Sequence, residues 1–143
     1  MPTPPIADLE RLVMGSVAIT ERAIAASGTD LTFFQWRVLL IVGDHESGAT
    51  IGEIASRIGA HASPASRLIS RLRDRGVVAT TKDADDGRVT RVRLTDAGRE
   101  LRTRVIQHRR RDLADLAIRP DVRLTPQDRA AIARLARAFE SYT

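Results

Sequence analysis

The sequence contains no cysteine among its 143 residues. This absence excludes disulfide bonds, zinc sites built from thiolates and a redox sensor based on a thiol. No apolar stretch approaches the roughly 18 residues that a membrane-spanning helix needs. The opening segment MPTPPIADLERL places prolines where a secretory signal would carry its basic and apolar regions. We therefore expect a soluble, cytoplasmic protein with no membrane partner.

The sequence also lacks the signatures of common catalytic sites. It has no Gly-rich loop that cradles phosphate, no HExxH pattern and no GxSxG pattern. The three histidines, His45, His61 and His108, are far apart and lie in loops or among charged residues. The run HRRRD, residues 108–112, could form an anion site but is more typical of a solvated helix face. We expect no enzyme activity, no cofactor and no metal site.

The remaining composition favours one domain with a nucleic-acid partner. Hydrophobic residues make up 43% of the chain, enough for a core without disulfides. Lysine and arginine number 23 against 18 acidic residues, and the sequence pI is near 11. Most of the excess lies in residues 67–93, where eight basic residues accompany four aspartates. Such a concentration is typical of a nucleic-acid-binding protein, although a well-solvated basic surface would look similar.

The segment LTFFQW carries the signals of a helix start. Thr32 and Gln35 have the spacing of a capping box, in which each side chain bonds the other residue's backbone amide. Leu31 and Trp36 occupy the positions of a hydrophobic staple, which favours a core position for Trp36. The pattern predicts a helix over residues 33–43, because GDHESG then supplies loop residues.

A second capping box begins the segment TIGEIASRI. Thr50 and Glu53 occupy its two positions, and apolar residues follow at i, i+3, i+4 and i+7 on one helix face. This spacing predicts a short amphipathic helix that ends at Gly59.

The next helix, in SPASRLISRLRDRG, exposes serines and arginines. Ser63 could cap it with Pro64 at the first helical position, and His61 could equally mark its start. Gly76 ends it. The helical period separates a buried stripe from a polar face. The buried stripe comprises Ala65, Leu68, Ile69 and Leu72. Opposite it lie Ser63, Arg67, Ser70 and Asp74, with Ser66 and Arg71 on the flanks.

Two short helices joined by a small turn, the second with an exposed polar face, form the pattern of a helix-turn-helix. An ordinary helical hairpin with a solvated outer face would show the same pattern. The following segment favours the first interpretation, because VVATTK and RVTRVRL are β-branched runs on either side of DADDG. They predict a β-hairpin directly behind the second helix. The expected fold is therefore mainly α with a small β-hairpin wing, a winged helix-turn-helix.

Long helices are predicted on both sides of this lobe. The N-terminal helix closes before Gly28. After the hairpin, Thr95 caps a helix that continues to Pro120, and Thr125 caps a final helix with Pro126 at its first position. We expect one domain, 1–143, in which residues 31–95 form the DNA-binding lobe and residues 1–30 and 96–143 form dimerisation helices.

The terminal helices carry apolar residues on more than one face. Leu12 and Ile19 add to the stripe of the N-terminal helix, and the final helix is expected to bury Ile132, Leu135 and Phe139. The apolar positions of the helix after the hairpin are Leu101, Val105, Leu113 and Leu116. A small monomer has little reason for such surfaces. We therefore predict that these helices pair with a second copy of the chain.

The acidic loop DADDGR is open to three interpretations. An EF-hand loop fails, because its sixth position would be Arg88 and its twelfth Leu94. Asp83 and Asp85 are typical of a solvated turn. Asp86 lies two residues before Arg88, on the same side of an extended segment, where the carboxylate could orient the guanidinium. An oriented arginine at a hairpin tip suits a narrow, negative minor groove.

Taken in order, four segments resemble the motifs of the MarR family of winged helix-turn-helix transcriptional regulators. They are LTFFQWRVLL, TIGEIASRI, SRLISRLRDRGVV and DADDGRVTRVRLTDAGREL. The terminal helices resemble the family's dimerisation region, so the resemblance covers nearly the whole chain. It implies a homodimeric repressor that binds an imperfect palindrome in double-stranded DNA. A recognition helix from each subunit would enter successive major grooves, and each wing would lie over a flanking minor groove.

The resemblance also assigns DNA contacts by position. Arg88 would enter the minor groove with Asp86 orienting it, and Arg91 and Arg93 are weaker candidates for phosphate contacts. The residues expected to face the major groove are Ser63, Ser66, Arg67, Ser70 and Arg71.

Two positions depart from the family's usual pattern. Ala84 stands where proline is common, and Ser70 stands where the family often has an acid, so the base preference of relatives does not transfer. Arg67 or Arg71 could bind guanine bidentately, which contributes about 1–3 kcal/mol of discrimination, and each could equally contact phosphate.

The resemblance further implies release from DNA by a small, often aromatic or anionic effector bound between the DNA lobe and the dimer helices. Phe33 and Phe34 lie on a helix that could line such a cleft, whereas Trp36 is more typical of core. Arg37 and His45 carry no stronger signal. The alternative function is a winged-helix module that binds DNA without sequence preference, or that binds a protein partner.

Overall fold

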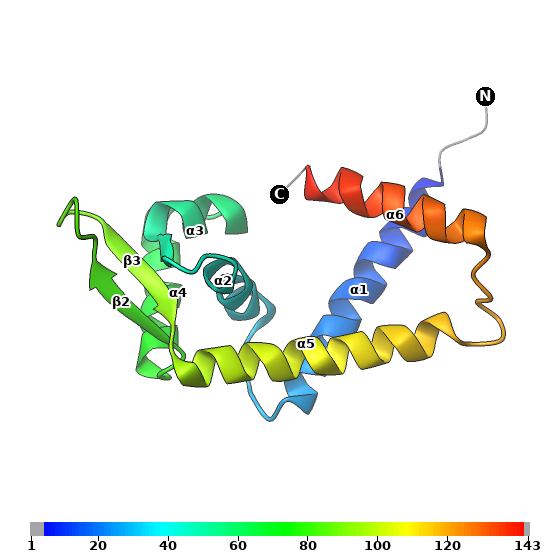
Figure 1. Cartoon of the computed structure of the whole chain (residues 1–143), viewed down its shortest axis with the longest axis horizontal. Helices are drawn as coiled ribbons and strands as arrows, with labels where there is room; N and C mark the ends of the chain where they lie inside the picture. Colours follow the sequence, from blue (N-terminus) through cyan, green and yellow to red (C-terminus); the bar gives the residue numbers. More distant parts are fainter. Residues whose placement is uncertain (1–4, 142–143) are drawn as a thin grey trace. The chain divides into compact units, whose positions relative to one another are not determined.

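The computed structural model describes residues 5–141 (Figure 1). In this range the chain is mostly helical with one small antiparallel sheet, as predicted. The elements are α1 (Ile6–Ala26), α2 (Phe33–Gly43), β1 (Ala49–Thr50), α3 (Ile51–Ile58), α4 (Ala62–Asp74), β2 (Val78–Lys82), β3 (Thr90–Leu94), α5 (Asp96–Ala117) and α6 (Pro126–Glu140). The chain divides into two compact units, one up to Arg109 and one from Arg110 onward. None of the described helices is long and apolar enough to cross a membrane.

Side-chain caps set the starts of α2, α3, α5 and α6, as predicted. Thr32 Oγ1 accepts the backbone N–H of Gln35 at 3.2 Å, and Gln35 Oε1 accepts that of Thr32 at 2.9 Å. Thr95 Oγ1 accepts the N–H of Gly98 at 3.1 Å at the start of α5. The same reciprocal box forms before α3 and α6, from Thr50 with Glu53 and from Thr125 with Asp128. These starts depend on local chemistry alone, which is why spacing in the sequence predicts them.

The start of α4 decides between two alternatives. The helix begins at Ala62 with His61 as its N-cap residue, so Ser63 and Pro64 lie inside the first turn. The His61 side chain makes no capping hydrogen bond. Proline is tolerated there because the first-turn amides have no partner within the helix. The Ser63 cap is therefore wrong, and Ser63 stays on the exposed face.

The core of the first unit lies between the helix-turn-helix and the sheet. Trp36 is fully buried, which confirms its core position. Ala23 and Ile24 of α1 and Leu101 and Val105 of α5 join the same cluster. The other large side chains that are fully buried are Leu39, Ile54, Leu72, Val38, Val42 and Val92. Burial of these side chains from five helices and a strand supplies the main driving force for this unit.

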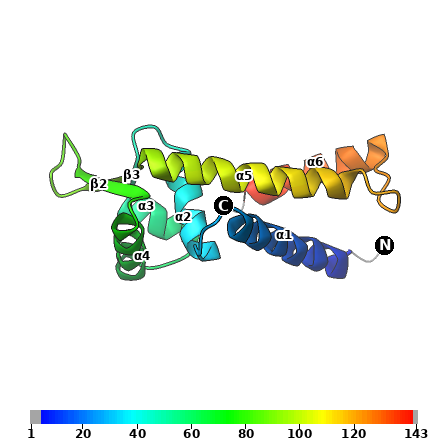
Figure 2. The same ribbon diagram turned by 90° about the horizontal axis from the view of Figure 1, so that it is seen from below.

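The wing is a hairpin with one further strand. The strand order is β1-β3-β2, and all pairs are antiparallel. Val78 pairs with Leu94 at one end of the hairpin and Lys82 with Thr90 at the other. β2 runs beside α4 (Figure 2). Sequence reasoning missed β1, because a strand of two residues has no periodicity to detect.

The second unit contains the end of α5, the following turn and α6. α5 ends at Ala117, before Pro120. α6 buries none of its residues in the single chain: Ile132 and Phe139 are each 50% exposed and Leu135 is 37% exposed. The expectation that these three side chains are buried is therefore wrong for the single chain. Leu113 and Leu116 of α5 are exposed as well.

Candidate nucleic-acid interface

The solvent face of α4 gathers the five residues predicted for the major groove. Ser63, Ser66, Arg67 and Arg71 are exposed, and Ser70 is half-buried. Steps of three and four residues place them on one face, opposite Ala65, Ile69 and Leu72 in the core. Among the described residues, the guanidinium groups of Arg67 and Arg71 have no hydrogen-bond or ion-pair partner. The face therefore carries two unpaired positive charges together with serine hydroxyls.

Two other basic residues, one in α4 and one directly after it, have partners that sequence reasoning missed. Arg73 Nη2 donates to Ser70 Oγ at 3.4 Å. Arg75, just after the helix, forms a bidentate pair with Asp30 at 2.5 and 2.9 Å, which lowers the pKa of that carboxyl. Asp30 lies 45 residues earlier, so no local pattern signals the pair. It connects the end of α4 to the loop before α2.

The acidic loop between β2 and β3, residues 83–89, is called the wing loop below. It projects beyond α3 and α4 (Figure 1). The sequence interpretation of Asp83 as a solvated turn residue is wrong. Its side chain is 12% exposed and forms an ion pair with Arg91. Its Oδ1 also accepts the backbone N–H groups of Asp85 at 2.9 Å and Asp86 at 3.2 Å. Asp85 is exposed, as a solvated turn residue should be.

The predicted pairing of Asp86 with the Arg88 guanidinium is also wrong. Asp86 Oδ1 accepts the backbone N–H of Arg88 at 2.9 Å, because the chain turns at this point instead of remaining extended. Within residues 5–141 the Arg88 guanidinium has no partner, and the residue is exposed. Asp86 therefore orients the backbone of Arg88 and leaves its charge free.

Arg91 and Arg93 of β3 are engaged with the protein itself. Besides its ion pair with Asp83, Arg91 donates from Nη1 to the Gly48 carbonyl at 3.4 Å. Arg93 donates from Nε to the Ser47 carbonyl at 3.1 Å. These contacts hold the turn before β1 against the hairpin, so both arginines have a structural role in addition to any role in binding.

A hollow of about 330 Å³ lies between the wing loop and the start of α3. It is lined by Thr50, Ile51, Gly52, Arg88, Val89 and Thr90. It places Arg88 beside the first turn of α3, where backbone N–H groups have no partner within the helix. The pairing of β1 with β3 brings the two segments together. Sequence reasoning missed this proximity because it did not predict β1.

The ion pair with Arg91 gives Asp83 an unusually low pKa. Donation by the guanidinium, and then by the Asp85 and Asp86 amides, lowers the pKa of Asp83 to about 2. A carboxyl whose pKa is lower in the folded chain than its unfolded value, about 3.9, stabilises the fold above that value. The contribution is lost as the pH falls toward 2. We expect the NMR chemical shift of the Asp83 carboxyl carbon to show a carboxylate that is still mostly ionised at about pH 3. A midpoint near the unfolded value would show that the pair is absent in solution.

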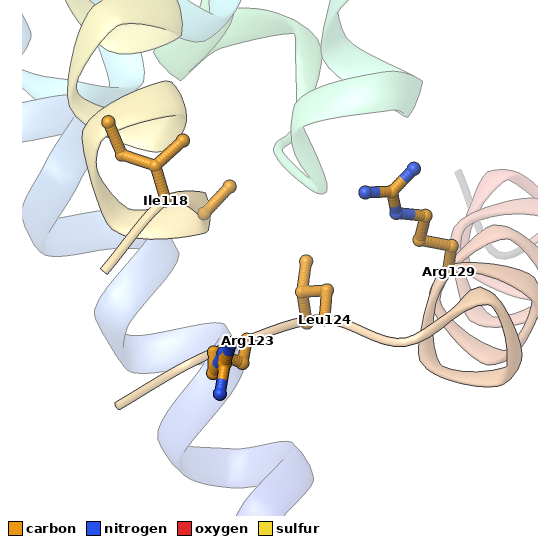
Figure 3. Close-up of a pocket in the computed structure, with 5 residues that line it drawn as sticks. Ile118, Arg123, Leu124 and Arg129 are labelled. Atoms are coloured by element: carbon orange, nitrogen blue, oxygen red, sulfur yellow. The ribbon is translucent and has the colours of Figure 1, made fainter. Parts of the chain in front are cut away.

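A separate hollow of about 510 Å³ lies in the second unit. Figure 3 shows Leu124 pointing toward the space between Ile118 and Arg129. Ala117 and Arg123 complete the lining. It combines apolar and cationic side chains, a composition suited to an anion with an apolar part. No group of three or more metal-ligating side chains occurs in the part of the chain that the structure describes.

The aromatic residues considered for an effector cleft do not surround one enclosed cavity. Trp36 is core, and Phe34 is exposed. Phe33 is half-buried and lines a shallow hollow of about 390 Å³ beside α1, together with Glu21, Ile24 and Asp30. Nothing in this arrangement singles out these aromatics as a binding site.

Comparison with known sequences identifies relatives of the DNA-binding lobe. Residues 28–89 match the model of the MarR family. The repressor IacR of Pseudomonas putida, described as an HTH-type transcriptional repressor, is 36% identical over 69 residues, which cover 48% of this chain and 41% of that protein. The HTH-type regulator Hpr of Bacillus thuringiensis is also 36% identical over 69 residues, 48% of this chain and 37% of Hpr. The matched segment thus spans about two fifths of the length of these curated relatives.

Solved structures match the chain over nearly its full length. Rv1404 of Mycobacterium tuberculosis aligns with a TM-score of 0.77 and 23% identity over 99% of this chain and 95% of the other. A MarR family protein of Bacillus stearothermophilus aligns with a TM-score of 0.74 and 24% identity over 99% and 97%. BpsR of Bordetella bronchiseptica aligns with a TM-score of 0.67 and 25% identity over 92% of this chain and 95% of BpsR.

The two kinds of comparison agree with the geometry. The curated relatives are transcriptional regulators, and the segment that the MarR family model matches is part of the helix-turn-helix lobe described above. Its helix-turn-helix and wing lie within or next to the matched segment, and the structural likeness extends to the terminal helices. Residues 28–89 of the chain are therefore similar to the MarR family, and nearly the whole chain shares the fold of a MarR family protein.

Proposed function

We propose that the chain is a sequence-specific DNA-binding transcriptional regulator, a homodimeric repressor of an imperfect palindromic operator. One observation carries the proposal: the guanidinium groups of Arg67, Arg71 and Arg88, which have no partner within residues 5–141, lie on α4 and the wing loop of a MarR-like fold. The description of IacR as a repressor supports the direction of regulation.

In this proposal α4 enters the major groove and the wing loop lies over the adjacent minor groove. Arg67 and Arg71 contact guanine edges or phosphates, and Ser63, Ser66 and Ser70 contribute hydroxyl contacts. Arg88 inserts its free guanidinium into the narrow minor groove, where the negative potential is strongest. Asp86 acts on Arg88 through the backbone.

The first test is selection from a random duplex library with the purified chain, at low and at near-physiological salt. We expect an enriched palindrome whose half-sites lie about one helical turn apart, because each subunit presents one α4. Retention without an enriched motif at either salt would favour the module without sequence preference. No retention at all would contradict DNA binding and favour a protein partner.

Dimerisation is supported by apolar surface that the single chain leaves uncovered in each unit. In the first unit, α1 exposes Ile6, Leu12, Val13 and Met14. In the second unit, the exposed apolar side chains are Leu113, Leu116, Ile118, Ile132, Leu135 and Phe139. Clusters of this kind on a soluble monomer are uncommon and mark association surfaces. We propose that a second copy covers them, which supplies the second recognition helix.

Placing acids on the apolar stripe of α6 should separate the subunits. The double variant Ile132→Glu with Phe139→Glu should sediment as a monomer at micromolar concentration, whereas the original chain sediments as a dimer. Both side chains are half exposed in the single chain, so helical circular dichroism should be retained. Gln127→Glu, on the same helix but outside the stripe, is the matched control and should remain dimeric. If the double variant stays dimeric, the dimer interface does not include the apolar stripe of α6.

We also propose that a small anionic effector releases the repressor from its operator. The DNA binding of BpsR, which is 25% identical, is regulated by 6-hydroxynicotinic acid. The hollow beside Leu124, with Arg123 and Arg129 in its lining, is a candidate receptor for a carboxylate with an aromatic ring. Aromatic carboxylates should displace a labelled operator from the original chain, and Arg129→Gln should raise the concentration required. Displacement that is identical in the variant would exclude this hollow.

A further inference from the structure

The contacts of the wing loop point to a device that positions Arg88. We propose that Asp83 and Arg91 form a clamp that holds residues 83–89 in the conformation that presents Arg88 to DNA. Arg91 is then a positioning residue and not a phosphate contact. The inference rests on the proposed DNA-binding function and adds to it a role that charge alone would not suggest, because Asp83 is an acid near a polyanion.

Asp83 is the centre of the clamp. One carboxylate oxygen accepts hydrogen bonds from the backbone N–H groups of Asp85 and Asp86, and the other accepts a hydrogen bond from Nε of Arg91. Its own N–H donates to the Val89 carbonyl at 2.9 Å, which closes the base of the loop. The side chain is only 12% exposed, although it lies in a loop that projects from the surface. Its two oxygens thus satisfy three donors, an arrangement typical of a structural carboxylate.

Arg91 anchors the clamp to the body of the lobe. Its Nη1 donates to the Gly48 carbonyl at 3.4 Å, and its backbone pairs with Thr50 across β1 and β3. Gly48 has φ +82, and a Cβ at this position would lie 2.6 Å from the Val92 carbonyl oxygen. Only glycine therefore brings this carbonyl so close to β3 without strain. The Arg91 side chain is 32% exposed, and its guanidinium donates to two acceptors of the protein.

A continuous series of hydrogen bonds runs from Arg91 to Arg88. Arg91 donates to Asp83, the Asp86 amide donates to Asp83, and the Arg88 amide donates to Asp86. The Arg88 guanidinium, at the end of the series, stays unpaired among the described residues. Loss of the Asp83 carboxylate would remove the acceptor of three donors at once and release the segment that carries Arg88. A simple charge argument predicts the opposite, since removal of an acid near phosphate strengthens binding.

These opposite signs define the test. Asp83→Ala and Asp85→Ala each remove one negative charge from the same loop, but in the described part of the chain the Asp85 carboxylate accepts no hydrogen bond and forms no ion pair within 4 Å. On the duplex enriched by selection, Asp85→Ala should bind as tightly as the original chain or slightly tighter. Asp83→Ala should bind about tenfold more weakly, because Arg88 is no longer held in place. Equal or tighter binding by Asp83→Ala would overturn the clamp.

Salt dependence separates positioning from phosphate contact. Arg88→Gln should weaken binding and reduce the slope of log Kd against log salt by about 0.9, because one released counterion is lost. Arg91→Gln should weaken binding about tenfold with little change in that slope. Arg91→Lys keeps the charge but not the two-acceptor geometry of the guanidinium, so it should behave like Arg91→Gln. A reduced slope for Arg91→Gln, together with full affinity for Arg91→Lys, would identify Arg91 as a phosphate contact.

A measurement on the chain without DNA tests the clamp independently of the proposed DNA binding. Amide hydrogen exchange of Asp85 and Asp86 in the full chain should accelerate in Asp83→Ala and in Arg91→Gln, and should be unchanged in Arg88→Gln. Unchanged exchange in the first two variants would overturn the clamp even if DNA binding is established. Accelerated exchange in a chain that retains no duplex would support the clamp as a structural feature and contradict the proposed function.

Discussion

Replacing Gly98 with alanine should destabilise the first unit by about 3 kcal/mol, near the upper end of the usual cost of overpacking. A Cβ at this position would lie 2.0 Å from the Val77 carbonyl oxygen and 3.0 Å from the carbonyl carbon. The Val77 oxygen already accepts the Thr95 N–H at 3.2 Å, and Thr95 Oγ1 donates to the Gly76 carbonyl at 2.6 Å. These hydrogen bonds hold the start of α5 against residues 76 and 77, so the helix cannot move away from Val77 to make room for a Cβ. Urea unfolding followed by circular dichroism measures the change.

Gly52→Ala is the matched control for this prediction. Gly52 is also helical, in the first turn of α3, and a Cβ there would have only the Thr50 hydroxyl nearby, at 3.9 Å. Alanine is the better helix former, so this variant should be unchanged or stabilised by up to about 1 kcal/mol. If both variants unfold at the same urea concentration as the original chain, the close approach of α5 to Val77 does not exist in solution.

Removing both arginines from the exposed face of α4 should abolish specific DNA binding. Arg67→Ala and Arg71→Ala should each cost about 1–3 kcal/mol if the residue contacts a base, and less if it contacts phosphate. Together they remove the two unpaired charges of this face, so the enriched duplex should bind no better than an unrelated one. Fluorescence anisotropy with both duplexes, repeated at several salt concentrations, measures the loss.

The single variants distinguish base contacts from phosphate contacts. Loss of a base contact relaxes the preference at one position of each half-site, whereas loss of a phosphate contact weakens all duplexes alike and lowers the salt slope by about one. Arg22→Ala removes an exposed arginine from α1 and is the matched control, for which we expect a change of less than about twofold. A double variant with affinity close to that of the original chain would show that α4 is not the recognition helix.

Local chemistry explains why much of the fold could be predicted from the sequence. The boxes of Thr32 with Gln35 and of Thr50 with Glu53 involve residues three positions apart, so each is legible in a short window. The same holds for the hairpin, where β-branched runs flank a turn segment rich in aspartate. The exposed serines and arginines of α4 follow from the helical period once the buried stripe is known.

The wing loop shows where this reasoning stops. Spacing favoured Asp86 as the partner of the Arg88 guanidinium, since the two residues are close in sequence and an extended segment would align them. In the folded chain the segment turns, Asp86 bonds a backbone amide instead, and Asp83 pairs with Arg91 eight residues away. Which of the three neighbouring carboxylates pairs with an arginine depends on the local direction of the backbone, and the residue types alone do not reveal that direction.

The sequence by itself determined the starts of α2, α3, α5 and α6, the polar face of α4, the hairpin and hence the resemblance to the MarR family, because these depend on contacts within a few residues or on simple periodicity. The tertiary structure alone decided which charges are free. Asp30 pairs with Arg75 and Asp83 with Arg91, while Arg67, Arg71 and Arg88 keep no partner in the described residues. It also decided that Gly98 must approach Val77 and that β1 must join the sheet. Each of these depends on segments brought together by burial of a shared core, and the sequence around either partner carries no sign of the other.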